Sequence, residues 1–223
     1  MSSILLSSSP IVQPAPEAPR KLEASPWADI VFRNVTRLAA LLDATAGLKR
    51  VTVTTHRRES FGEPMAANLR ALRGFVQRHP DTAVIFPMHP NPAVRAAAGM
   101  LGGLDRVWLT DPLDYPDFIG LLAESWVIAS DSGGVQEEAP SLGKPVLVMR
   151  DTTERPEAVD AGTVKLVGTD QVKIVSEAYR LLDDTAAYEA MSRAHNPYGD
   201  GHAARYIVDA IEKWQQQRSR KSA

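Results

Sequence analysis

Six short apolar runs alternate with segments of helical periodicity, and this alternation constrains the fold more than any other feature of the sequence. The apolar runs cover residues 51–55, 83–88, 107–110, 126–130, 145–149 and 164–168. Apolar residues recur at helical spacing in segments at 65–79, 92–101, 115–124, 170–194 and 203–217, and in a shorter segment that follows Gly133-Gly134 and stops around 140–143. Strands that alternate with helices form parallel sheets with right-handed crossovers. We therefore predict an α/β fold with a doubly wound, mostly parallel, Rossmann-like sheet.

The predicted domain does not extend over the whole sequence. Residues 1–26 are rich in Ser and Pro and predict a flexible lead-in. Residues 27–47 predict one amphipathic helix that ends near Gly47. We place the Rossmann-like domain at 48–217 and a disordered tail at 218–223.

Composition excludes several classes of function. The formal net charge of -2 gives no general attraction to nucleic acid. The absence of cysteine excludes a thiolate nucleophile and every Cys-containing zinc site, and no two histidines have metal-ligand spacing. No run approaches 18 apolar residues and the start lacks the features of a signal peptide, so we expect a cytoplasmic protein with no membrane partner.

Polar side chains follow the apolar runs. In doubly wound sheets ligands bind beyond the carboxyl ends of the strands, so the loops there carry the chemistry. Four such loops, at 55–62, 89–92, 130–134 and 150–157, are rich in polar residues. We expect them to converge on one edge of the sheet.

The turn Ser132-Gly133-Gly134 has the features of an anion-binding site. Glycines let the backbone approach a ligand closely, and the free amides at a helix start point toward it. A tight turn in which Ser or Asp caps the helix is an equally good interpretation of this spacing. One turn further on, Glu138 could accept both hydroxyls of a ribose, or it could be an ordinary solvated helix residue.

Two histidines follow predicted strands. His56 precedes Arg57, so an imidazole that can transfer protons lies beside a guanidinium that can bind phosphate. His89 precedes Pro90-Asn91-Pro92, a rigid turn that fixes the direction of its ring. A charged loop and a hydrogen-bonded histidine with only structural roles are the alternatives.

Several of these motifs together resemble one family. They are Thr55-His-Arg-Arg-Glu-Ser-Phe-Gly62, His89-Pro-Asn-Pro92, Asn196-Pro-Tyr-Gly-Asp-Gly201 and the long run from Ser130 to Glu157, which begins Ser-Asp-Ser-Gly-Gly-Val-Gln-Glu-Glu. In this order they are similar to the non-hydrolysing UDP-N-acetylglucosamine 2-epimerases, over about residues 48–212. The resemblance implies a glycosyltransferase-B-type fold, in which two Rossmann-like halves hold the nucleotide sugar between them. This sequence matches the C-terminal half.

The resemblance also implies roles for individual residues. Ser132, Gly133 and Gly134 would contact the diphosphate, Glu138 the ribose hydroxyls, and His56 the catalytic centre.

Three further residues carry implied ligand contacts. Arg57 and His89 match positions near a second, regulatory nucleotide-sugar site of bacterial members, and Arg150, in the long matching run, is expected to bind substrate.

The implied reaction interconverts UDP-N-acetylglucosamine and UDP-N-acetylmannosamine by elimination and re-addition of UDP, with no cofactor or metal. The family's catalytic carboxylates lie in its N-terminal half, which this sequence does not match. We therefore expect the chain to be inactive alone and to need a separately supplied N-terminal-half polypeptide. The alternatives are a non-catalytic UDP or UDP-sugar binding module or regulatory subunit, and half of a glycosyltransferase, which fits the fold but not the specific run around Gly133.

The last predicted helix raises a question of packing. In this fold the C-terminal helix usually crosses to the N-terminal half, so Ile207, Ile211 and Trp214 are expected either to be exposed or to pack against the helix at 27–42. Exposure would promote self-association, and a homodimer is expected.

Overall fold

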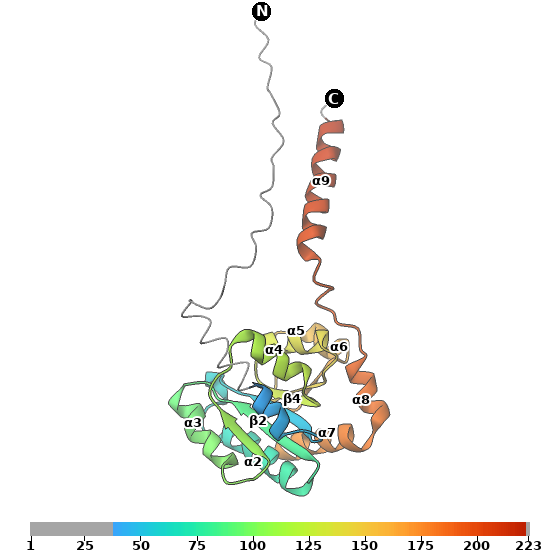
Figure 1. Ribbon diagram of the computed structural model, residues 1–223. Coiled ribbons are helices and arrows are strands. Elements are labelled where there is room, and N and C mark those ends of the chain that lie inside the picture. The colour runs from blue at the N-terminus through green and yellow to red at the C-terminus, as the bar shows by residue number, and fades with distance from the viewer. Residues whose placement is uncertain (1–37, 222–223) are drawn as a thin grey trace, which may run out of the picture.

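A six-stranded parallel sheet forms the centre of the computed structural model, which describes residues 38–221 (Figure 1). The strand order is β3-β2-β1-β4-β5-β6, and every neighbouring pair is parallel. The strands are β1 (Lys49–Thr54), β2 (Thr82–Pro87), β3 (Val107–Thr110), β4 (Val127–Ser130), β5 (Val146–Val148) and β6 (Val164–Leu166). The predicted doubly wound Rossmann-like sheet is confirmed, and all six strands coincide with the apolar runs to within two residues at either end.

Helices cover both faces of this sheet. One layer contains α2 (Glu63–Arg78), α3 (Pro92–Ala98), α7 (Gln171–Asp183) and α8 (Thr185–Ser192), whose buried side chains join one core cluster with the strands. The other contains α4 (Tyr115–Ala123), α5 (Gly133–Ser141), α6 (Pro156–Asp160) and the helical residues 38–44. Two 3₁₀ turns, η2 (Arg58–Ser60) and η3 (Gly99–Leu101), complete these layers.

The apolar side chains of the helix α2 lie on one face and pack against the sheet. Leu69, Leu72, Phe75 and Val76 recur at three- and four-residue spacing and are almost fully buried against the sheet. The helix begins after Gly62, whose φ of 83° is a left-handed conformation that glycine adopts without strain. This start places the polar loop 55–62 at the carboxyl edge of β1.

Two helices differ from the prediction. The segment predicted as one helix at 170–194 is broken at Asp184, whose side chain accepts a hydrogen bond from the Ala187 backbone N–H at 3.0 Å and caps α8. The short helix α6 was not predicted, although Pro156 at its first turn is a typical helix start.

The structure describes part of the predicted segments at the two ends of the domain. The predicted lead-in at 1–26 and residues 27–37 of the first predicted helix lie outside the described residues. Residues 38–44 are helical, and Gly47 has a positive φ of 78°. The helix α9 (Ala203–Lys221) continues past residue 217, so residues 218–221 of the expected disordered tail are helical, and 222–223 are not described.

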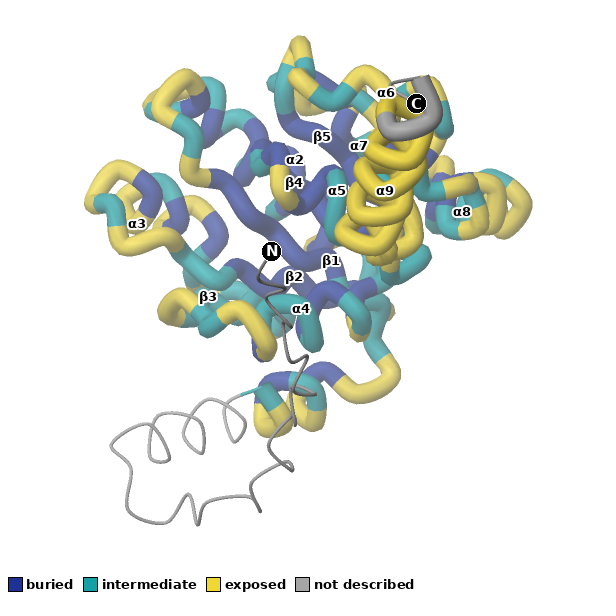
Figure 2. Tube along the Cα trace, turned by 90° about the horizontal axis from the view of Figure 1, so that it is seen from above, coloured by how far each residue is buried: buried dark blue, intermediate teal, exposed yellow. Residues whose placement is uncertain are grey.

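The helix α9 projects away from the α/β body (Figure 1), and its residues 203–218 are exposed (Figure 2). Ile207, Ile211 and Trp214 are each more than half exposed, so the first of the two predicted arrangements is observed. Within residues 38–221, no helix is both long and apolar enough to cross a membrane.

Candidate functional site

The loops after β1 and β4 meet at the point where the strand order reverses. β1 lies between β2 and β4, and the crossovers from β1 and β4 run to opposite faces, which opens a crevice at their carboxyl ends. The Thr54 and Ser130 hydroxyls, at the ends of the two strands, are 2.6 Å apart. The residues that follow them, His56 and Ser132, therefore start on the two sides of one crevice.

The start of α5 has no side-chain cap from its N-cap residue. Ser132 occupies the N-cap position, but its side chain makes no capping hydrogen bond. The capping interpretation of this serine is therefore not realised, and Gly133 and Gly134 supply backbone N–H groups of the first turn. A Cβ atom on Gly133 would lie 3.0 Å from Glu154 Oε1 and 3.3 Å from Arg57 Nη2, so only glycine fits this position without displacing them.

A hollow of about 290 Å³ extends from this helix start. Its polar wall contains five of the predicted site residues, namely His56, His89, Ser132, Gly134 and Glu138. Its other lining is mainly apolar and comes from the ends of β2 and β3 and from α4 and α5, including Pro87, Pro112, Leu113, Phe118 and Val135. A mainly apolar hollow that contains a few polar side chains suits a ligand with a charged part and a flat ring.

The two histidines of the hollow lie side by side. The rings of His56 and His89 stack with their centroids 5.5 Å apart and their planes 15° apart. His89 Nδ1 accepts a hydrogen bond from the Asn91 backbone N–H at 3.1 Å, which fixes this ring in the Pro-Asn-Pro turn. One nitrogen of His89 is therefore hydrogen-bonded, as the structural alternative expected, and the ring also lines the hollow.

Glu138 has a partner that the sequence did not indicate. The Tyr115 hydroxyl, on α4, donates to Glu138 Oε1 at 3.3 Å. Burial raises the pKa of Glu138 above its usual value, the Tyr115 hydrogen bond opposes this shift, and Glu137 adds to it. Glu138 is half-buried in the hollow, so it is not an ordinary solvated helix residue.

Arg57 and Arg150 lie together, beside Gly133, in a closed ring of four alternating charges that we call the ion-pair ring. Arg57 pairs with Glu59, at 3.6 Å, and with Glu154. Arg150 pairs with Glu59 at 3.2 Å and with Glu154 at 2.6 Å. A hydrogen bond from its own backbone N–H, followed by the one from Arg150, lowers the pKa of Glu154 to about 2.

The structure therefore divides the predicted site residues into two neighbouring groups. Five line the hollow, Arg57 and Arg150 belong to the ion-pair ring, and Gly133 touches the ring at the start of α5. Within residues 38–221, no group of three or more His, Asp or Glu side chains could hold a metal ion.

Sequence reasoning missed three residues of this edge. Asp131 stands inside a matching motif but had no role assigned, and the structure buries its carboxylate against the loop after β1. Glu154 lies in the polar loop 150–157, but the sequence indicated no role for it. Tyr115 carries no motif and is brought to Glu138 only by the packing of α4 beside α5.

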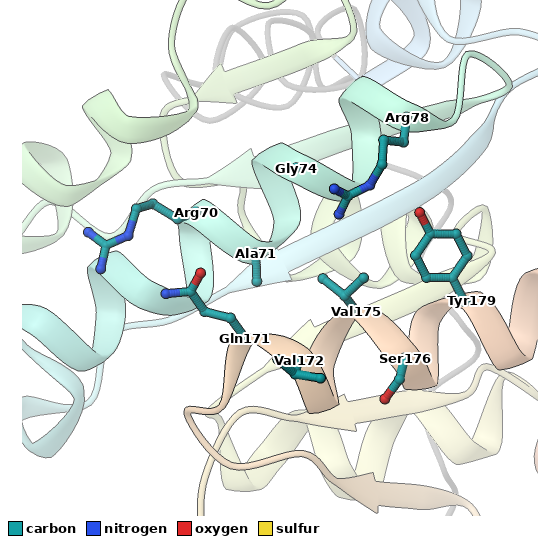
Figure 3. Close-up of a pocket in the computed structure, with 9 residues that line it drawn as sticks. All are labelled: Arg70, Ala71, Gly74, Arg78, Gln171, Val172, Val175, Ser176 and Tyr179. Atoms are coloured by element: carbon teal, nitrogen blue, oxygen red, sulfur yellow. The ribbon is translucent and has the colours of Figure 1, made fainter.

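A larger groove, of about 460 Å³, lies between α2 and α7 (Figure 3). Figure 3 shows Arg78 and Tyr179 over one end of it and Gln171 at the other. All its lining residues come from these two helices, and none of the predicted site residues is among them. The polar edge of the sheet, and not this groove, is the candidate site.

The fold and the polar edge define a Rossmann-like α/β domain of the kind that forms one half of a glycosyltransferase-B-type fold. The family model for UDP-N-acetylglucosamine 2-epimerase matches residues 26–212. The chain belongs to this family.

Individual relatives agree with this assignment. The UDP-N-acetylglucosamine 2-epimerase of Escherichia coli K12 is 55% identical over 165 residues, which are 74% of this chain and 44% of that protein. The structure of S. aureus MnaA with UDP matches with a TM-score of 0.75 and 45% identity, over 79% of this chain and 48% of that one. The Neisseria meningitidis UDP-GlcNAc 2-epimerase bound to UDP-GlcNAc matches with a TM-score of 0.73 and 39% identity, over 84% and 52%. The chain spans about half the length of the curated relatives it matches.

Proposed function

We propose that this chain forms the UDP-binding half of a UDP-N-acetylglucosamine 2-epimerase that does not hydrolyse its substrate. One observation carries the proposal. The start of α5 at Ser132, Gly133 and Gly134, where the Ser132 side chain makes no capping hydrogen bond, lies in the same crevice as the hollow that Glu138 and His56 line. The family relation supports it, because relatives that match this half are named for this activity and one of them was solved with UDP.

We assign one part of the nucleotide to each part of the site. The diphosphate binds the backbone amides of Gly133 and Gly134 and the Ser132 hydroxyl, because a helix N-terminus favours anions. The ribose hydroxyls donate to the Glu138 carboxylate, and the uracil ring occupies the mainly apolar lining of the hollow beyond it. The sugar lies toward His56 and His89.

In the proposed reaction the proton on carbon 2 of the sugar is removed, and its electron pair forms a double bond to carbon 1. The bond from carbon 1 to the diphosphate oxygen breaks at the same time. UDP then adds back to carbon 1, and a proton returns to carbon 2 on the opposite face. Departure of UDP places negative charge on the diphosphate, which the amides at the start of α5 are positioned to stabilise.

Proton transfer at carbon 2 needs a base that this half does not supply. Glu138 is the only carboxylate among the described residues that line the hollow, and we propose that it binds the ribose hydroxyls. We propose that the base comes from an N-terminal half, continuous with this sequence or on a separate polypeptide, and that α9 contacts that half through its apolar face. Arg57, His89 and Arg150 are then placed where the two halves and a second nucleotide sugar meet.

Titration of the purified chain with UDP tests the binding part of this proposal. Calorimetry is expected to show binding that Glu138→Ala weakens at least tenfold, a loss of about 1.4 kcal/mol. Glu212→Ala, on the exposed helix α9, is the matched control and should bind UDP like the parent chain. Absence of UDP binding by the parent chain would overturn the proposal.

A second candidate, a UDP or UDP-sugar binding module without catalysis, rests on the lack of a positioned base. The two candidates differ when the chain is mixed with the N-terminal half of a relative and supplied with UDP-N-acetylglucosamine. Formation of the mannosamine epimer only in the mixture supports the enzyme. Epimerisation by this chain alone would contradict the proposed need for the other half.

A further inference from the structure

Asp131 is a buried carboxylate that holds the loop after β1. It follows β4 directly and is fully buried. Its backbone N–H donates to the Thr54 carbonyl at 3.1 Å, so its position is fixed by the pairing of β1 with β4. Its side chain therefore has a defined direction, toward the loop that carries His56.

Three successive residues of that loop donate to this carboxylate. The Thr55 hydroxyl donates to Oδ2 at 2.7 Å, and the backbone N–H of Arg57 donates to Oδ2 at 3.1 Å. The backbone N–H of His56 lies 3.1 Å from both carboxylate oxygens. Both oxygens act as acceptors, so the ionised carboxylate fits these contacts and an amide in its place would not.

The same carboxylate faces the imidazole of His56. His56 Nδ1 lies 3.8 Å from Asp131 Oδ1, which is too far for a hydrogen bond. The carboxylate is fully buried and the imidazole is 43% exposed, so the charge of Asp131 acts on the ring from its protein side. Within the described part of the chain, no Lys or Arg forms an ion pair with Asp131, and the Arg57 guanidinium is engaged by Glu59 and Glu154. His56 Nδ1 therefore faces a carboxylate whose other side-chain partners, among the described residues, are the three loop donors.

We propose that Asp131 is a positioning residue that keeps the proton of neutral His56 on Nδ1. A negative charge beside Nδ1 attracts an N–H there and repels a lone pair, whereas free histidine in water prefers the proton on Nε2. The nitrogen on the other side of the ring, Nε2, then carries the lone pair and is the one available to a ligand in the hollow. His89 stacks on the face of this ring and not on its edge, where the two nitrogens lie.

This inference deepens the proposed function, because it sets the form in which His56 meets the nucleotide sugar. With its lone pair on Nε2, the ring can accept a hydrogen bond from a hydroxyl or N–H group of the ligand. The base that removes the proton on carbon 2 still comes from the other half, and His56 orients the sugar for that step.

Nitrogen NMR of the imidazole rings tests this assignment without any ligand or catalysis. Two-bond ¹H–¹⁵N correlation spectra of the ¹⁵N-labelled chain, recorded at alkaline pH where imidazoles are neutral, distinguish the two tautomers. The His56→Gln variant identifies the signals of His56 among the five histidines. We expect the Nδ1–H form as the major tautomer of His56 in the parent chain and as the minor one in Asp131→Asn.

Two variants separate this effect from a loss of structure. Thr55→Val removes one hydrogen bond to the carboxylate but keeps its charge, so the Nδ1–H form should remain major. Asp81→Asn changes an aspartate paired with Lys49, before β2, and should leave the spectrum of His56 unchanged. If Asp131→Asn fails to fold, the parent chain and Thr55→Val still decide the question.

A major Nε2–H tautomer in the parent chain would overturn the inference, whatever the chain binds. An Nδ1–H tautomer that persists in folded Asp131→Asn would also overturn it, because another group would then hold the proton. Neither result bears on UDP binding, which is measured separately, so failure of this inference and failure of the proposed function remain distinguishable. In the assembled enzyme, Asp131→Asn is expected to lower kcat by at least tenfold while the dissociation constant for UDP changes by only a few-fold.

Discussion

The Arg57 guanidinium and the Glu154 carboxylate form an ion pair that lies directly against Gly133 at the start of α5. The carboxylate therefore occupies space beside the amides that are proposed to hold the diphosphate. An anionic ligand and Glu154 compete for the same guanidinium, because charge-assisted hydrogen bonds to carboxylate and to phosphate use the same donors. The ion-pair ring and ligand binding are expected to be linked.

A side chain at position 133 should disturb this arrangement. In Gly133→Ala the new Cβ meets Glu154 and Arg57 at 3.0 and 3.3 Å, so both side chains must shift. Because their ends can move, we expect a loss of only about 1 kcal/mol in the free energy of unfolding. UDP affinity should fall at least tenfold, since the same methyl group narrows the approach to the amides. Gly99→Ala is the control, because a Cβ there meets nothing within 4 Å. Equal UDP affinity in Gly133→Ala and the parent would contradict the proposed diphosphate site.

Replacement of Glu154 should lower stability in a pH-dependent way. Its pKa falls from a usual value of 4.5 to about 2 on folding, so its stabilising effect is complete above about pH 4.5 and is lost as pH falls toward 2. The side chain is 39% exposed, and solvent screening limits the effect to about 1 kcal/mol. Urea unfolding of Glu154→Gln should show this loss at neutral pH and a smaller one near the acid end. Glu189→Gln, in an exposed pair with Arg193, should change stability by less than about 0.5 kcal/mol.

The variant Glu154→Gln should raise the affinity for UDP, although it lowers stability. Glu154→Gln removes a negative charge from the side of α5 where the diphosphate approaches and releases Arg57 to it. Calorimetry at low salt is expected to show UDP affinity raised several-fold, with the gain shrinking as salt increases. Weaker binding by this variant would mean that Glu154 orients Arg57 for the ligand and does not compete with it.

Acidification should weaken UDP binding through Glu138. The ribose hydroxyls need the ionised carboxylate, and burial places the pKa of Glu138 above 4.5, so affinity should begin to fall at a higher pH than for an ordinary glutamate. Tyr115→Phe removes the hydrogen bond that opposes this shift, so the decline should move to still higher pH. Titrations with UDP at several acidic pH values measure how affinity depends on pH. The variant Glu138→Gln, which has no carboxylate at this position, is the control and should show no such decline. Identical curves for Tyr115→Phe and the parent would exclude the predicted contribution of Tyr115.

Self-association of the chain should depend on one face of α9. Ile207, Ile211 and Trp214 lie at i, i+4 and i+7 and are exposed, so this face can be buried only against another surface. Sedimentation velocity should show concentration-dependent association that the double variant Ile207→Gln, Ile211→Gln reduces without a change in the unfolding free energy of the α/β body. The pair Arg205→Gln, Glu212→Gln, on the opposite face, is the control. A parent chain that stays monomeric at every concentration would contradict the prediction.

Local patterns were sufficient to predict the sheet. Each strand coincides with an apolar run, and β2, β4 and β5 are almost entirely buried. The alternation of these runs with helices determines a parallel order. The break at Asp184 was missed because apolar spacing continues across it in α8, although Asp183-Asp184-Thr185 contains a capping signal. The prediction thus failed where a local hydrogen bond ended a helix that the apolar pattern alone would continue.

The candidate site was predictable in part. The loops after the strands identified His56 and Ser132, and the helix turn after the second loop identified Glu138; the structure brings all three to one hollow. The contacts between side chains were not predictable, because they depend on which strands become neighbours. Arg57 reaches Glu154 only because β4 lies beside both β1 and β5, and no spacing along the chain encodes that distance.

The contact between the Thr54 and Ser130 hydroxyls also has a consequence for folding. These residues are 76 positions apart, and their strands pair only after the intervening segment from α2 to α4, which contains two strands and three α-helices, has been closed into a loop. The two sides of the crevice do not exist as a unit before that late, long-range step, so partly folded chains should lack affinity for the ligand. A ligand present during refolding would then act only on the completed fold, slowing its unfolding without accelerating its formation.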